Sequence, residues 1–326
     1  MKSKELRCWS RWGEIYNMLS TYEKLPADLL LPHGEKRRRI FLAGKGGVGK
    51  TTLACTIAMY TADQGLKTLL VTTDPAAHIG NVFGETVTAS PKQISGTSLW
   101  LARIDPKVAF EAYRQQVLSS LVDQFGNGET VNRVSEELNS PCTEEVAVFQ
   151  EFLEYLLSDE YEVTVFDTAP TGHTIRLLQL SWDYETELEN KDAFTAETAA
   201  LDGAQLARMN DAIRTLQDRD ETGMFFVTLP EATPIAEMER AMADLERTQI
   251  HTEAIIINQV LPEEAATSRL FGKRLKLQTA HIKAVKERNS DQTIAVATLQ
   301  EDEILGPELL KQFAEQVVEK SQEVIV

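Results

Sequence analysis

The sequence predicts an α/β domain with a doubly wound, mainly parallel β-sheet and helices on both faces. Seven short apolar or β-branched runs alternate with longer helical patterns, at residues 40–43, 68–72, 99–104, 162–166, 224–229, 254–257 and 293–299. Near-continuous apolar strands of this kind are typical of parallel sheets buried on both faces. A glycine-rich stretch follows the first run and acidic residues follow two others, as expected where ligands bind at the carboxyl ends of strands.

The glycine-rich stretch, residues 44–52, reads GKGGVGKTT and joins the first predicted strand to a helical pattern. In a strand, loop and helix of this kind, backbone N–H groups converge on phosphate oxygens and the helix dipole favours negative charge. Lys50 can reach the β- and γ-phosphates, and the Thr51 hydroxyl is placed to bind Mg²⁺. A turn without a ligand seldom carries Lys-Thr at this offset, so we expect ATP or GTP to bind. The predicted nucleotide-binding residues of the loop are Gly44, Lys45, Gly46, Gly47, Val48, Gly49, Lys50, Thr51 and Thr52.

Lys45 is an additional lysine near the start of this loop. It is either a solvated surface residue or a cation that reaches the nucleotide of a second subunit. The Lys-Gly-Gly-x-Gly-Lys-Thr pattern resembles that of the deviant Walker A group of P-loop NTPases and favours the second interpretation. Such a lysine would act like a trans-acting arginine finger, stabilising charge when two nucleotide sites face each other.

Two acids follow predicted strands. Asp74 comes after the second strand, in the sequence VTTDPAAH, and is expected to hold Mg²⁺ or to position the attacking water. Asp167 directly follows the strand at 162–166 and is expected to be a further Mg²⁺ partner. The Pro-Thr-Gly sequence after it suits a loop that rearranges when the γ-phosphate is lost. Asn258 ends another strand, where its amide could read a base edge or cap a turn.

Composition limits the class of protein. The chain has 326 residues, 43% of them hydrophobic and 25% charged, and a formal net charge of −17. The negative charge disfavours sequence-independent nucleic-acid binding and adsorption to anionic membranes. No apolar run is long enough to insert into a membrane, and the N-terminus leads into no apolar signal core. The three cysteines are widely separated and imply no disulfide framework. We therefore expect a cytoplasmic protein that binds no nucleic acid.

Outside the alternating pattern, the chain is predicted to carry an extension and two helical insertions. Residues 1–38 are expected to form an N-terminal extension, followed by the ATPase domain at 39–326. The insertions are expected at about 106–161 and 180–220, on one side of the sheet, with a helix near 206–216. The basic run at 36–39 is predicted to be a solvated entry to the first strand.

Several motifs together resemble the ArsA family of arsenite-pump ATPases and its relatives that target tail-anchored proteins. They are the phosphate loop, the sequence DTAPTGHT at 167–174, RIDP at 103–106, SPCTEEVAVF at 140–149 and VTLPEATP at 227–234. The resemblance runs from about residue 38 to the C-terminus and is greatest to the C-terminal half of two-half members. It implies that two nucleotide domains face each other, with Lys45 acting in trans, Asp74 and Asp167 in the two switches, and Asn258 on adenine. Residues 1–38 would resemble the linker between halves.

The same resemblance implies a site for trivalent arsenic or antimony, with Cys142, His173 and Ser140 as ligands. A soft, thiophilic centre selects thiolate, and ligands from two halves would link binding to closure. The alternative is that Cys142 is an ordinary buried residue and Ser140 a helix cap. This chain also lacks the additional cysteine that the first half of such proteins supplies downstream of the switch II helix.

We therefore expect an ATP-hydrolysing cytosolic subunit of an arsenite or antimonite efflux system, with ATP and Mg²⁺ as cofactors. Its expected partners are a second copy or a second ATPase half, a membrane arsenite carrier and a metallochaperone. A targeting ATPase for tail-anchored membrane proteins is the main alternative, although acidic residues crowd 180–216 and no paired cysteines occur near 261–278. An iron–sulfur electron-transfer ATPase would need more thiolates, and the net charge disfavours a partition ATPase.

Overall fold

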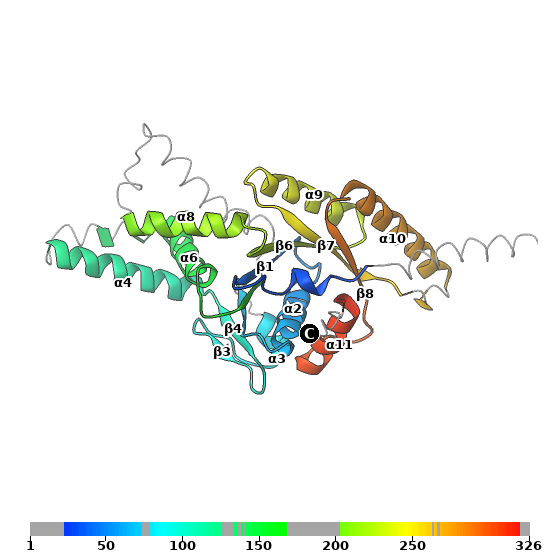
Figure 1. The fold of residues 1–326 in the computed structure, drawn as a ribbon, viewed down its shortest axis with the longest axis horizontal. Coiled ribbons are helices and arrows are strands. Elements are labelled where there is room, and N and C mark those ends of the chain that lie inside the picture. Colours follow the sequence, from blue (N-terminus) through cyan, green and yellow to red (C-terminus); the bar gives the residue numbers. More distant parts are fainter. Residues whose placement is uncertain are drawn as a thin grey trace, which may run out of the picture.

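The fold is described by a computed structural model that covers residues 23–73, 78–125, 134–135, 138–139, 141–167, 203–262, 264–265 and 268–319. Within these residues the chain forms one eight-stranded sheet with helices on both faces (Figure 1). The strands are β1 (Arg38–Ala43), β2 (Thr68–Thr72), β3 (Lys92–Gln93), β4 (Leu99–Arg103), β5 (Val163–Asp167), β6 (Thr222–Thr228), β7 (Thr252–Val260) and β8 (Thr293–Thr298). All seven predicted strands are present, so the predicted fold class is confirmed.

The strand order is β3-β4-β2-β5-β1-β6-β7-β8, and every neighbouring pair is parallel except β3 and β4. The first strand in sequence therefore lies inside the sheet, between β5 and β6. Strand β3 was not predicted, because its two residues are exposed and give no apolar signal. The position of β1 places the loop after it at the carboxyl edge of the sheet, where its neighbours also end.

Helices cover both faces of the sheet. One face carries α2 (Lys50–Asp63), α3 (His78–Phe83) and α11 (Gly306–Val317), and the other carries α6 (Pro141–Leu156), α8 (Gly203–Gln217), α9 (Ala232–Glu246) and α10 (Arg269–Arg288). Helix α4 (Pro106–Phe125) packs against α6, and the short 3₁₀-helix η1 (Ala27–Leu29) precedes β1. Among the described residues, no helix is both long and apolar enough to cross a bilayer.

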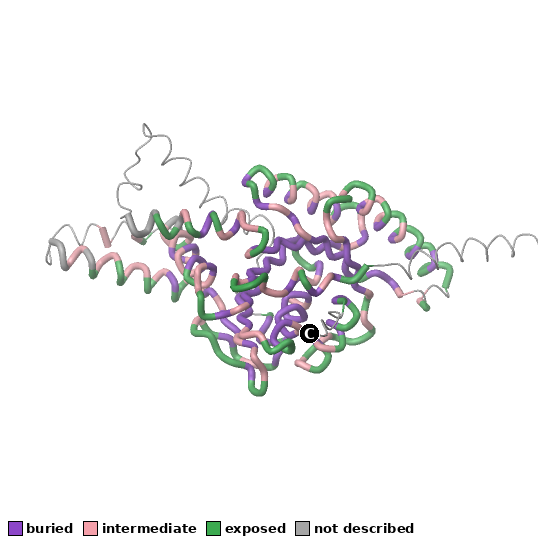
Figure 2. The backbone as a smooth tube through the Cα atoms, viewed as in Figure 1, coloured by how far each residue is buried: buried purple, intermediate pink, exposed green. Residues whose placement is uncertain are grey.

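Alternating side chains of each strand divide the core into two layers. In β1, Ile40 and Leu42 face α2 and its neighbours, whereas Phe41 faces the layer with α6. Phe41 stacks on Phe166 of β5 with ring centroids 4.5 Å apart, and Phe152 of α6 packs on both rings. Burial is continuous through the central strands in Figure 2, which explains why both faces of these strands read as apolar.

The predicted insertion at 106–161 is helical in its described part, where α4 and α6 occur without a strand. In the second insertion α8 includes the helix predicted near 206–216, while residues 180–202 lie outside the described residues.

The segment before β1 packs into the domain more closely than the predicted extension implies. Leu25 and Leu30 are buried, and Leu25 forms a bridge with Val318 after α11. Residues 23–38 therefore belong to the folded unit, and the predicted extension remains a prediction for residues 1–22, which lie outside the described part.

The prediction of a solvated basic run at 36–39 is wrong for its last two members. Arg38 has no exposed surface, and its guanidinium donates to the carbonyl oxygens of Leu29 and Arg219 and pairs with Glu253. Arg39 is also buried and pairs with Glu221 at 2.9 Å. Both residues begin β1, and the layers that cover this strand also cover their side chains.

Candidate nucleotide-binding site

The phosphate loop leaves β1 at the carboxyl edge of the sheet and ends where α2 begins. Gly44 passes so close to β6 that a Cβ atom on it would lie 2.3 Å from the carbonyl oxygen of Val227. Gly49 is the N-cap of α2 and has φ of +92°, a backbone conformation that favours glycine. Gly46 and Gly47, between them, are exposed. The loop thus presents exposed backbone beside the N-terminus of a 14-residue helix, as anion binding requires.

Lys50 is the first residue of α2, and its side chain folds back over the loop. Its Nζ donates a hydrogen bond to the carbonyl oxygen of Lys45 at 3.1 Å, and the residue is buried. An ammonium group at this place, beside a helix N-terminus, is suited to a phosphate group that approaches the exposed backbone. The structure therefore brings the predicted lysine to the predicted loop.

Asp167 ends β5, directly beside the loop-bearing strand. It pairs in register with Leu42 of β1 on one side and with Thr72 of β2 on the other. The residue is only 2% exposed, and Thr72 Oγ1 donates to its Oδ2 at 3.5 Å. A buried carboxylate and the hydroxyl of Thr51, in the first turn of α2, are oxygen donors of the kind that Mg²⁺ prefers. These residues fit the predicted magnesium site.

Lys45 has a partner that no local sequence pattern predicts. Its Nζ lies 2.8 Å from Glu237 Oε1 on α9, and the two side chains are 45% and 35% exposed. The ion pair therefore lies at the surface of the chain, and Lys45 remains accessible for a second role.

Asn258 lies in β7, two strands away from β1, yet it contacts the loop. Its Nδ2 donates to the carbonyl oxygen of Val48 at 2.9 Å, and its Oδ1 accepts a hydrogen bond from the backbone N–H of Gln259. The predicted site residue is therefore brought to the loop, through a contact that spans 210 residues of sequence.

The remaining predicted ligands are not placed by this structure. Asp74, Ser140 and His173 lie outside the described residues, and Cys142 is the second residue of α6 with no described side chain. In the part of the chain that the structure describes, no group of three His, Cys, Asp or Glu side chains is arranged to hold a metal ion. The predicted metalloid ligands remain predictions.

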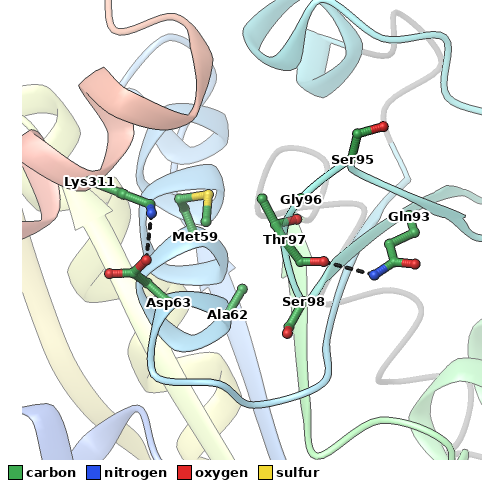
Figure 3. Close-up of a pocket in the computed structure, with 9 residues that line it drawn as sticks. All are labelled: Met59, Ala62, Asp63, Gln93, Ser95, Gly96, Thr97, Ser98 and Lys311. Carbon is green, nitrogen blue, oxygen red and sulfur yellow. Dashed lines mark hydrogen bonds and ion pairs between the residues drawn. The ribbon is translucent and has the colours of Figure 1, made fainter.

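Two cavities lie away from the loop. One of 440 Å³ opens between the C-terminal end of α2, the β3–β4 connection and α11, where Lys311 pairs with Asp63 and Gln93 donates to the Thr97 carbonyl (Figure 3). Because α2 is about 20 Å long, this cavity is remote from the loop at the other end of the helix. The other, of 280 Å³, lies where α4, α6 and α8 meet.

Comparison with known proteins identifies the family. The model of the ArsA anion-transporting ATPases matches residues 37–319, which include the loop, Asp167 and Asn258. This chain belongs to that family. It is 40% identical over 293 residues to a putative arsenical pump-driving ATPase of Halobacterium salinarum, covering 89% of this chain and 45% of that protein. It is 36% identical over 304 residues to the arsenical pump-driving ATPase of Acidiphilium multivorum, covering 92% of this chain and 48% of that protein.

The family also contains proteins similar in extent to this chain. The ATPase get3 of Aspergillus terreus is 31% identical over 311 residues, covering 86% of this chain and 90% of that protein. In contrast, this ArsA-family chain spans a little less than half the length of the two arsenical pump-driving relatives. The comparisons thus establish the ATPase family without separating its branches.

Proposed function

We propose that this chain is an ATP-hydrolysing cytosolic subunit that drives the efflux of arsenite or antimonite. The observation that carries the proposal is the phosphate loop, with Lys50 folded over it and the Asp167 carboxylate buried beside it. The names and the 36–40% identity of the arsenical pump-driving relatives support the choice of cargo.

In the proposed hydrolysis, the loop N–H groups and Lys50 bind the β- and γ-phosphates of ATP. Thr51 and Asp167, together with Asp74, would hold Mg²⁺, which supplies charge neutralisation at the phosphates. Asp74 positions the attacking water. Pre-organised donors at the loop stabilise the charge that develops on the transferred group.

Pairing of two nucleotide domains is the second part of the proposal. These 326 residues contain one phosphate loop, and a second nucleotide domain, from another copy or from another ATPase half, would supply the facing site. Lys45 then completes the opposite site, because a cation that arrives only on pairing stabilises the transition state only in the closed assembly. Its exposure at the surface is compatible with this role.

The substrate of the proposed efflux is trivalent arsenic or antimony, bound between the paired domains by Cys142, His173 and Ser140. Binding that bridges two domains stabilises their closed arrangement, so substrate would stimulate hydrolysis. A membrane arsenite carrier receives the substrate, and a metallochaperone delivers it.

The test is steady-state ATP hydrolysis with and without arsenite or antimonite, with zinc as a control ion. We expect stimulation by the metalloids alone, a loss of all hydrolysis in Lys50→Ala, and a loss of stimulation with unchanged basal hydrolysis in Cys142→Ala. Cys8→Ala is the matched cysteine control and should behave as wild type. Basal and stimulated rates that fall together in Cys142→Ala would assign that residue a structural role.

A targeting ATPase for tail-anchored membrane proteins is the second candidate. The 31% identity to the ATPase get3 of Aspergillus terreus over 86% of this chain supports it. Normal basal hydrolysis without metalloid stimulation, together with capture of a synthetic peptide carrying a single apolar helix, would support this function over efflux.

A further inference from the structure

Helix α10 has a basic and partly apolar outer face, although the chain as a whole is strongly acidic. We propose that this face adsorbs to an anionic lipid surface through its lysine and arginine side chains and two exposed leucines. No helix inserts into the bilayer in this contact. The inference goes beyond the proposed ATPase, because it assigns a contact that hydrolysis itself does not require.

The charge of α10 is opposite in sign to that of the chain. The formal net charge of the 326 residues is −17, whereas the 20 residues of α10 include one acid, Glu287, and seven Lys or Arg side chains. The seven are Arg269, Lys273, Arg274, Lys276, Lys283, Lys286 and Arg288. At physiological ionic strength, exposed charges farther away than about 8 Å are largely screened. The potential beside the outer face is therefore set by α10 and its nearest neighbours.

Acidic side chains near α10 neutralise only part of this charge. Three of the seven cations have an acidic partner: Arg274 with Glu231, Arg288 with Glu239 and Lys283 with Glu287. Arg269 and Lys273 are exposed, and neither has an ion pair among the residues that the structure describes. The first turns of α10 therefore present positive charge to the solvent.

The apolar residues of α10 are divided between two faces. Leu275, Ile282 and Val285 are buried, so the inner face is already occupied by the domain. Leu270 and Leu277 are instead 71% and 60% exposed. They lie two turns apart with Lys273 between them, at the i, i+3 and i+7 positions of one helix face. In Figure 2, α10 lies at the edge of the sheet with its outer turns exposed.

The chemistry of this face favours a lipid surface over a protein partner. Four of the seven cations are lysines, which are depleted at protein interfaces. Clusters of about four to eight Lys or Arg on an amphipathic helix are typical of contacts with anionic headgroups. Neither of the two cavities described above is lined by α10, so neither offers a pocket on this face for an anchoring side chain. At a lipid surface the cations would meet the headgroups while Leu270 and Leu277 enter the acyl boundary.

Co-sedimentation of the full chain with vesicles tests the inference. The vesicles consist of phosphatidylcholine alone or of phosphatidylcholine mixed with phosphatidylserine. We expect binding only to the vesicles that contain phosphatidylserine, and a lower bound fraction as the salt concentration rises. Absence of binding to these vesicles at low salt would overturn the inference.

Substitutions on α10 then locate the contact. Arg269→Gln/Lys273→Gln should lower the partition coefficient about thirtyfold, as the loss of two cations near the surface implies. The control Lys92→Gln/Lys107→Gln changes the net charge equally at two exposed lysines outside α10 and should bind as wild type. An equal loss in both double variants would show that net charge and not this face is responsible, which would overturn the inference.

A second pair of variants tests the apolar part of the contact. Leu277→Ser should lower the partition coefficient about fivefold, because a leucine that enters the acyl boundary loses its hydration. Leu309→Ser is the control, since Leu309 is 41% exposed on α11, and it should leave binding unchanged. Unchanged binding in Leu277→Ser would contradict the proposed contact of the leucines.

An acidic polypeptide and ATP hydrolysis separate the remaining outcomes. Binding of poly-glutamate that requires Arg269 and Lys273, without binding to vesicles, would assign the face to an acidic protein and overturn the inference. Melting temperature and basal ATP hydrolysis without vesicles should be the same in the variants as in wild type. A wild-type chain that hydrolyses no ATP would refute the proposed function, whereas the vesicle assay would still decide the role of α10.

Discussion

Arg38 shows how a single buried charge joins distant parts of the chain. Its guanidinium has no exposed surface and is satisfied by the carbonyl oxygens of Leu29 and Arg219 and by Glu253. Burial raises the pKa of Glu253, although the neighbouring arginine opposes this effect. One side chain at the start of β1 therefore holds together the segments that contain Leu29, Arg219 and Glu253.

Arg38→Ala should lower the free energy of unfolding by about 2–4 kcal/mol, because it removes a fully buried guanidinium and leaves a half-buried carboxylate and two carbonyls without their partner. Urea denaturation measures the change. Arg37→Ala is the matched control: Arg37 has an exposed bond to the Asp159 carbonyl, so a change within about 0.5 kcal/mol is expected. Equal effects of the two substitutions would contradict this account of Arg38.

Among the helices, α4, α6 and α8 meet around a cavity that is lined by an acid with a raised pKa. Glu151 of α6 lines the cavity between these helices, and its pKa rises from 4.5 to about 7 because burial disfavours the carboxylate and Asp105 adds negative charge. The folded chain then binds more protons than the unfolded chain between these two values. The free energy of unfolding should therefore fall as pH rises through this interval and remain lower above it.

Glu151→Gln should remove this part of the pH dependence and raise the stability at pH 8 by on the order of 1–2 kcal/mol, a figure reduced for solvent screening. Urea denaturation between pH 5 and 8 measures it. Glu154→Gln, on the same helix but in an exposed ion pair with Arg208, is the control and should keep the wild-type slope. An unaltered slope in Glu151→Gln would show that another group is responsible.

For the whole molecule, the ion pair that Lys45 forms within one chain competes with its proposed contact to the nucleotide of a second chain. In the single chain it pairs with Glu237 of α9 at the surface. Exposed ion pairs of this kind contribute about 0.2–1 kcal/mol. If Lys45 acts across a dimer, this pair must break before the facing site is complete.

Glu237→Gln should therefore raise ATP hydrolysis about two- to fivefold at low protein concentration, with little change in melting temperature. The rate per chain is measured over a range of protein concentrations, on which it should depend in wild type and not in Lys45→Ala. Glu239→Gln is the control, since Glu239 lies on the same helix and pairs with Arg288 at 2.7 Å. A rate unaffected by Glu237→Gln would show that the pair does not restrain Lys45.

Local residue patterns are enough to predict the strands of this ATPase domain and its glycine-rich loop. The seven apolar strands, the glycine-rich turn and the strand-terminal Asp167 depend on local composition and spacing, and the structure places each as predicted. Asp74, Ser140 and His173 were predicted from the local sequence in the same way, but they lie outside the described residues, and the side chain of Cys142 is not described.

Which residues meet at the loop depends on how the folded sheet brings distant segments together. The contacts of Lys45 with Glu237 and of Asn258 with Val48 span 192 and 210 residues of sequence. The burial of Arg38 likewise depends on segments that the sheet brings together. No local pattern encodes such contacts, because they follow from the order in which the strands join the sheet and from the layers that cover it.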